Sequence, residues 1–171
     1  AGHFLLRGKA LYTGIFYNRQ PIMAYASAAI QYLFHPTAIY SLVLVHRVAI
    51  LFWAAAWSIF LIWRFGGPAL LFLMAYEGTK VYFYGYQFIG EALIVYPLVY
   101  LFALFWSGFE KKKVRVADIW AVMLAGVVSL WSREPYTPVA LFLVAGVVWV
   151  YRKDIKIRIA AGVVLLLSTL I

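Results

Sequence analysis

The chain has 171 residues, of which 66% are hydrophobic, 19% are aromatic and 12% are charged, and it contains no cysteine. Because a soluble domain usually has about 25% charged residues, this composition and a mean hydropathy of +0.90 argue against a soluble domain. They predict an all-α fold, a polytopic bundle of transmembrane helices. The lack of cysteine excludes disulfide bonds and thiolate metal sites.

The net charge of +9 does not indicate a nucleic-acid-binding protein. The densest basic clusters lie in short loops between apolar segments, as expected for cytoplasmic loops under the positive-inside rule. The sequence has no polar domain on which a basic face could meet the phosphates of a duplex. We therefore expect membrane lipids, and no nucleic acid, as partners.

Residues 1–38 are predicted to form a first outer loop with interfacial or short helices. Apolar residues around Phe4 and Leu11 repeat as an amphipathic set of turns that would lie in the membrane interface. The segment 22–34 is apolar but shorter than the ~20 residues needed to span a bilayer. We expect its helix to end at His35-Pro36, because proline cannot continue a helix.

Residues 39–171 are predicted to form a transmembrane helical region of about six spans. Apolar runs separated by polar or basic turns set their positions. The expected helices cover 39–63, 89–106, 119–131 and 139–151, with one more beginning at 68 and another from 159 onward. The runs 119–131 and 139–151 are short, which predicts a locally thinned bilayer or a recessed site.

The basic loops predict the topology. Loop 111–115 and loop 152–158 are separated by two expected spans, and both fall on the cytoplasmic side together with Arg64. The amino-terminal segment, residues 77–88 and the turn 132–138 then lie on the outer side.

The ends of the chain indicate a fragment. It begins at Ala1 without a methionine, and an apolar run continues to Ile171. We expect a missing first helix before Ala1 and truncation at the carboxyl terminus. The alternative is a small complete protein that has lost its initiator methionine.

Several cations fall on the expected outer side, where the positive-inside rule predicts few. They indicate an anionic partner, and an isoprenoid phosphate has its head at this depth and its tail in lipid. Arginine offers a planar fork to phosphate oxygens and lysine a point charge. We rank the candidate phosphate ligands as Arg19, Lys80 and Arg133. The alternative for each is anchoring to headgroups by a snorkelling side chain, or, for Arg133, a helix cap without chemistry.

Two carboxylates accompany these cations. Glu91 lies at a helix start inside an apolar run, where an ionisable residue is a functional candidate or simply complements the helix dipole. Glu77 stands three residues before Lys80, a spacing that favours an ion pair over a carboxylate facing an acceptor. His46 and Arg47 lie within a span, and we expect them near an interface or bonded between helices. The three histidines lie far apart, so no metal site is predicted.

The opening of the chain resembles the first outer loop of the GT-C superfamily, in the branch of protein O-mannosyltransferases and the lipid A aminoarabinose transferase. The residues that carry the resemblance are Phe4-Leu5-Leu6-Arg7-Gly8-Lys9-Ala10-Leu11-Tyr12-Thr13-Gly14-Ile15-Phe16, followed by Asn18-Arg19-Gln20-Pro21. Further loose similarity lies at Gly90-Glu91-Ala92-Leu93, Ala125-Gly126-Val127-Val128 and Arg133-Glu134-Pro135.

This resemblance implies an integral membrane glycosyltransferase of the plasma (inner) membrane. It would move a sugar from a polyprenyl-phosphate donor to a protein or lipid acceptor on the non-cytoplasmic face. The acidic residue that acts in such enzymes as general base or positions the acceptor is expected before Ala1, since no Asp or Glu lies between Ala1 and Tyr76. Arg19 is close to the position of a basic residue that contacts the lipid phosphate, and Glu77 and Glu91 remain supporting candidates.

The alternative is a non-enzymatic protein. A membrane subunit or transporter-like helical bundle would use the outer charges to bind lipid headgroups or a partner protein. An inverted repeat would favour transport, and the sequence has no convincing one.

Overall fold

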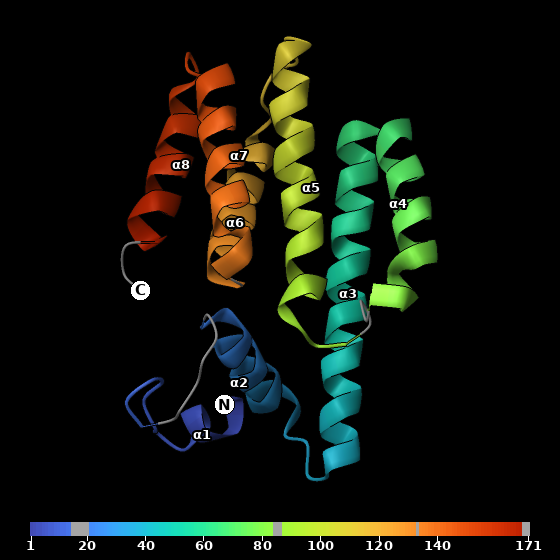
Figure 1. The fold of residues 1–171 in the computed structure, drawn as a ribbon, viewed down its shortest axis with the longest axis vertical. Helices are drawn as coiled ribbons and strands as arrows, with labels where there is room; N and C mark the ends of the chain where they lie inside the picture. Colours follow the sequence, from blue (N-terminus) through green and yellow to red (C-terminus); the bar gives the residue numbers. More distant parts are fainter. Residues whose placement is uncertain (15–20, 84–86, 133, 169–171) are drawn as a thin grey trace. The chain divides into compact units, whose positions relative to one another are not determined.

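The computed structural model describes residues 1–14, 21–83, 87–132 and 134–168, and within them the fold is all-α (Figure 1). This confirms the predicted fold class at the level of secondary structure. The chain divides into two compact units, unit 1 (Ala1–Leu93) and unit 2 (Ile94–Ile171). Unit 1 contains α1 (Gly2–Leu6), α2 (Ile22–Phe34), α3 (Ile39–Phe65), α4 (Gly67–Thr79) and the 3-10 helix η1 (Lys80–Phe83), and the start of α5 (Gly90–Phe109).

In unit 1, α2 packs against both α1 and α3, and α3 packs against α4. Helix α2 ends as predicted, because His35 adopts a left-handed conformation with φ of 45° and Pro36 follows. The next helix, α3, begins where the Ser41 hydroxyl accepts a hydrogen bond from the Ala38 N–H. This bond is one half of a capping box, because it satisfies the backbone N–H of the N-cap residue Ala38.

Helices α3 and α4 form a hairpin (Figure 1). Gly66 separates them with φ of 69°, a conformation that glycine adopts at little cost. Pro68 lies in the first turn of α4. A backbone N–H in the first turn has no partner within the helix, so the missing N–H of proline costs no hydrogen bond there. At its opposite end α4 passes directly into η1, so the helix stops at the polar residues 77–80 that the sequence marks as an interruption.

Unit 2 contains the remainder of α5, then α6 (Val116–Ser132), the 3-10 helix η2 (Glu134–Tyr136), α7 (Thr137–Val150) and α8 (Ile155–Ser168). Helices α6, α7 and α8 pack against one another, with Leu130, Ala140 and Val164 in their common core. Helix α5 joins them through α7, where the ring of Phe105 lies against Gly146.

The helices agree with the expected spans in order and differ at their ends. Helix α6 begins three residues earlier than predicted, at Val116, because Asp118 is accommodated in its first turn. Asp118 is fully buried, accepts a hydrogen bond from the hydroxyl of Tyr100 at 3.0 Å, and accepts one from the Arg115 N–H at 2.7 Å. The buried carboxylate of Asp118 therefore stabilises the start of α6, where a negative charge also complements the helix dipole.

Among the described residues, α3 and α5 are long and apolar enough to cross a membrane. With 27 residues, α3 is about 40 Å long, compared with a hydrocarbon core of about 30 Å. The other α-helices of the predicted transmembrane region have 13 to 17 residues. The arrangement of about six spans, with domains at 1–38 and 39–171, stays a prediction.

Candidate functional site

Unit 1 contains a hollow of about 530 Å³ with a mixed polar and apolar lining. It is formed by α1, by one face each of α2 and α3, and by the segment that precedes α5. Its polar side chains are His3, Ser27, Gln31, His46, Arg47 and Gln87. We call it the unit 1 hollow.

One wall of the unit 1 hollow is a chain of hydrogen bonds between helices. The side-chain N–H of Gln31 donates to Ser27 Oγ at 3.0 Å, and Ser27 Oγ lies 2.8 Å from Nε2 of His46. The carbonyl oxygen of Leu42 is 2.7 Å from His46 Nδ1 and can only accept, so Nδ1 carries a proton. The contact of Ser27 Oγ with Nε2 bonds the second ring nitrogen, so both nitrogens of His46 have a hydrogen-bond partner.

Helix α1 packs against this hydrogen-bonded wall at Gly2. A Cβ at that position would lie 2.7 Å from Ser27 Oγ, 2.7 Å from the backbone nitrogen of Ala28 and 2.9 Å from Gln31 Nε2. Only glycine allows α1 to approach α2 this closely. The ring of Phe88 lies edge-on to His46, with 4.6 Å between ring centroids. His46 is consequently 8% exposed.

Arg47 supplies the positive charge of the unit 1 hollow. It follows His46 in α3, about 12 Å along the helix from Ile39. Its side chain is exposed, and the described residues give its guanidinium no ion pair. An arginine this deep in a long apolar helix is costly in lipid unless it meets an anion or water.

Glu77 and Lys80 come together away from this wall. Nζ of Lys80 lies 3.2 Å and 3.1 Å from the two carboxylate oxygens of Glu77, which confirms the predicted ion pair. Lys80 is 1% exposed and Glu77 is 40% exposed. The ammonium also lies 5.9 Å from the centre of the Tyr76 ring. To bind a phosphate, the Lys80 ammonium would have to give up part of its contact with Glu77 or Tyr76. Its assignment as a phosphate ligand stays a prediction.

Three further residues were predicted to belong to the site: Glu91, Arg19 and Arg133. Glu91 lies in the first turn of α5 and is partly buried. The start of α5 is tied to α3 because the Trp53 indole N–H donates to the Leu93 carbonyl at 3.0 Å. Arg19 and Arg133 lie outside the described residues, so their assignment to the donor phosphate is untested.

Sequence reasoning missed part of the unit 1 hollow. The expectation that His46 is bonded between helices is confirmed, but its partner Ser27 was not identified. The available signal was the i, i+4 spacing of Ser27 and Gln31, two polar residues on one face of the apolar helix α2. Within the described residues, no three His, Asp or Glu side chains lie close enough to hold a metal ion.

The chain matches no family model, no curated protein and no solved structure. The lining of the unit 1 hollow holds one exposed guanidinium, the imidazole of His3 and two amide groups beside apolar walls, while both nitrogens of His46 are already bonded to Ser27 and Leu42. Such a lining suits an anionic group attached to an apolar body.

Proposed function

We propose that the chain acts as a membrane-embedded glycosyltransferase of GT-C type, with a polyprenyl-phosphate sugar as donor and an acceptor outside the cytoplasm. The resemblance of residues 4–21 motivates the proposal. The observation that carries it is the exposed guanidinium of Arg47 in the unit 1 hollow, with no ion pair in the described part of the chain.

Exposed apolar side chains support the location in a membrane. On α3, Phe52 is 71% exposed, Ile59 is 69% exposed and Trp63 is 57% exposed. Unit 2 likewise exposes large side chains of α6 and α7, among them Trp120 and Phe142. Water would penalise such continuous apolar surface, whereas lipid tails would not.

The unit 1 hollow supports recognition of the donor phosphate. The Arg47 guanidinium can bind two phosphate oxygens with parallel N–H groups. His3 of the same lining can donate a further hydrogen bond. The polyprenyl tail would lie against the apolar surface of α3, which exposes Val43, Val48 and Leu51 around Arg47. In this proposal Arg47 joins Arg19, Lys80 and Arg133 as a candidate ligand.

The transfer would proceed as a single displacement. The acceptor oxygen bonds to the anomeric carbon, the bond from that carbon to the phosphate oxygen breaks, and polyprenyl phosphate leaves with the electron pair. The proton of the acceptor passes to a general base, and cations stabilise the leaving phosphate. Glu77 and Glu91 keep supporting roles, because Glu77 already neutralises the buried Lys80.

The test measures donor binding and turnover separately. The full chain is placed in lipid nanodiscs, and binding of undecaprenyl phosphate is measured for the wild type, for Arg47→Ala and for Arg158→Ala. Arg158 is an exposed cation of α8 outside the unit 1 hollow, so it serves as the matched control. We expect Arg47→Ala to weaken binding about tenfold or more, since hydrogen bonds to charged groups contribute about 1.5–3 kcal/mol. Equal binding by Arg47→Ala would contradict the proposal.

Turnover is then followed as release of polyprenyl phosphate from a panel of polyprenyl-phosphate sugars. We expect release with at least one donor and a loss in Arg47→Ala.

A non-enzymatic lipid-binding subunit is the second candidate. It is favoured by the bonding of Gln31, Ser27 and His46 to one another, a pattern typical of helix packing in membranes. Binding of the probe without release from any donor would support this function instead.

A further inference from the structure

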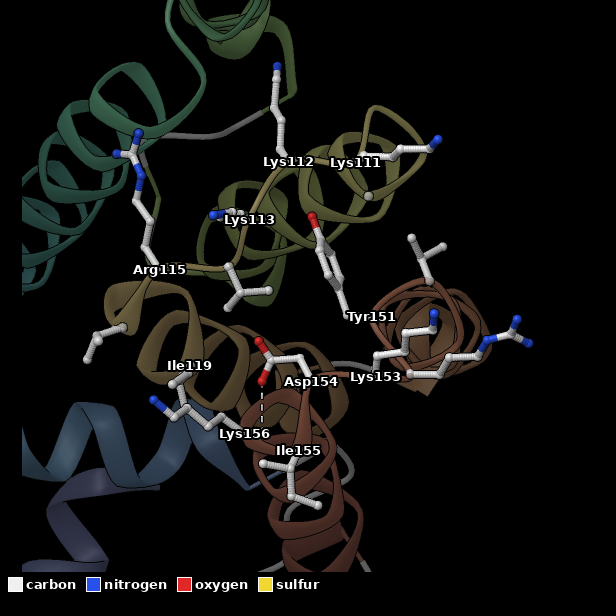
Figure 2. A pocket seen from close by; sticks show the side chains of 15 residues that line it. Lys111, Lys112, Lys113, Arg115, Ile119, Tyr151, Lys153, Asp154, Ile155 and Lys156 are labelled. Carbon is white, nitrogen blue, oxygen red and sulfur yellow. Dashed lines mark hydrogen bonds between the residues drawn. The ribbon is translucent and has the colours of Figure 1, made fainter.

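Unit 2 contains a second hollow, of about 940 Å³, at the end where α5 joins α6 and α7 joins α8 (Figure 2). Seven cations line it: Lys111, Lys112, Lys113 and Arg115 from one loop, and Arg152, Lys153 and Lys156 from the other. Asp154 is the one acidic residue of this lining. Figure 2 shows the basic side chains of both loops arranged around Tyr151 and Asp154. We call this feature the basic hollow.

The helix ends from which the two loops begin are bonded to each other. The hydroxyl of Ser107, in the last turn of α5, lies 3.0 Å from that of Tyr151, which ends α7. Gly108 lies so close to Val150 that a Cβ would have no room. These contacts hold the loops together before any ligand arrives, and preorganisation lowers the entropic cost of binding.

The loop backbones are fixed as well. The Arg115 N–H donates to the carboxylate of the buried Asp118, which anchors the end of the first loop. Asp154 accepts a hydrogen bond from the Lys156 N–H at 3.0 Å and so caps the start of α8. Asp154 offsets one of the seven positive charges of the lining, and Lys112 is ion-paired with Glu110 at 2.6 Å, so the lining keeps a net positive charge.

Lys111 stands where glycine is usual. The Lys111 N–H bonds to the Gly108 carbonyl and the Lys112 N–H to the Ser107 carbonyl, the two bonds of a Schellman motif. Lys111 holds the left-handed position with φ of 56°. A lysine there costs stability relative to glycine. In return, its side chain adds a cation to the lining of the basic hollow.

Apolar side chains border the cations. Val116 is 67% exposed and Ile155 is 58% exposed, and both line the basic hollow. Nearby on the same helices, Trp120 and Ile159 are 68% and 61% exposed. A free phosphate compound would leave this surface unused, whereas the acyl chains of a lipid would cover it.

We propose that the basic hollow of unit 2 binds the phosphate-rich headgroup of an anionic lipid, with the acyl chains lying along the exposed apolar surface of α6 and α8. Basic pockets between membrane helices bind such headgroups. This inference does not rest on the proposed function, because it concerns other residues in the other unit.

The experiment titrates fluorescent cardiolipin into the full chain in neutral detergent micelles, with phosphatidylcholine as the comparison lipid. We expect saturable binding of cardiolipin and none of phosphatidylcholine. The double variant Lys153→Ala/Lys156→Ala should bind cardiolipin more weakly by about fivefold for each charge removed. Both side chains are exposed, so their removal leaves the fold intact.

Two controls separate a built site from diffuse charge. Arg7→Ala/Lys9→Ala removes two exposed cations of unit 1 and should change binding less than twofold. Ser107→Ala keeps every charge but breaks the bond to Tyr151, and should still weaken binding. Equal loss in both double variants, or no loss in Ser107→Ala, would overturn the proposal in favour of a diffuse positive surface.

A soluble competitor distinguishes the source of the phosphate. Inorganic pyrophosphate should displace cardiolipin only at far higher concentration, since it lacks the apolar contacts. Displacement at concentrations similar to that of the lipid would assign the basic hollow to a soluble polyphosphate and overturn the lipid assignment.

Discussion

The hydroxyl oxygen of Ser27 lies 2.8 Å from Nε2 of His46 and so joins α2 to α3 within unit 1. These two residues are nineteen positions apart. The bond fixes the direction of the imidazole and leaves the next residue, Arg47, on the exposed side of α3. A structural hydrogen bond thereby positions the cation that the proposed function needs.

Ser27→Ala should destabilise the protein. The variant leaves Nε2 of the buried His46 and one amide N–H of Gln31 without their partner, at a cost of about 1–3 kcal/mol. The measurement is the free energy of unfolding in mixed detergent micelles. Ser58→Ala in α3 is the matched control, because the described residues give the Ser58 hydroxyl no hydrogen bond, and it should be nearly neutral. Similar effects in both variants would show that the interhelical bond contributes nothing.

Glu77→Gln should destabilise unit 1 by about 1–3 kcal/mol, because it removes the carboxylate charge that pairs with the buried ammonium of Lys80. The exposure of Glu77 keeps the cost below that of a fully buried pair. A double-mutant cycle with Lys80→Met measures the coupling through Tm. If Lys80→Met alone abolishes donor binding and leaves Tm unchanged, Lys80 is a ligand rather than a structural partner.

Asp118→Ala should cost about 2–3 kcal/mol, since it removes two hydrogen bonds to a buried carboxylate and the anchor of the α6 start. Asp154→Ala removes a partly exposed cap and should cost only about 1 kcal/mol. Chemical denaturation of both variants compares a buried with an accessible carboxylate at a helix start. A larger effect for Asp154 would contradict this account of unit 2.

Lys111→Gly should stabilise unit 2 by about 1 kcal/mol, because glycine adopts the positive φ of this position without strain. The same change should weaken cardiolipin binding, so stability and affinity move in opposite directions. Lys112→Gly removes a neighbouring charge where φ is not positive and should not raise Tm. A gain of Tm in both variants would exclude relief of backbone strain as the cause.

Single cysteines can test the predicted topology, because the chain has none of its own. Lys112→Cys and Lys153→Cys should react with a membrane-impermeant thiol reagent from one side of the membrane, and Glu134→Cys from the other. Labelling of intact and permeabilised cells separates the two sides. Labelling of Lys112→Cys and Lys153→Cys from opposite sides would contradict the predicted topology. It would also contradict the basic hollow, because the two loops that line it would then lie on opposite sides of the membrane.

Local rules were sufficient for most helix positions. The left-handed His35 before Pro36 ends α2, and Gly66 with Pro68 separates α3 from α4, as the sequence indicates. The predicted span 119–131 begins three residues after α6 does, and the local pattern did not place Asp118. Its place became clear only through Tyr100, which lies eighteen residues earlier on another helix.

The order of the residues was enough to predict the apolar, all-α character of the chain, the order of its helices, and the ion pair of Glu77 with Lys80 at helical spacing. These features depend on hydropathy and on contacts within one or two turns, which a linear pattern contains. The contacts between distant polar groups, in contrast, depend on how the helices pack. Ser27 with His46, and Ser107 with Tyr151, are joined by helix packing, and packing is set by side-chain shape across many residues rather than by spacing along the chain.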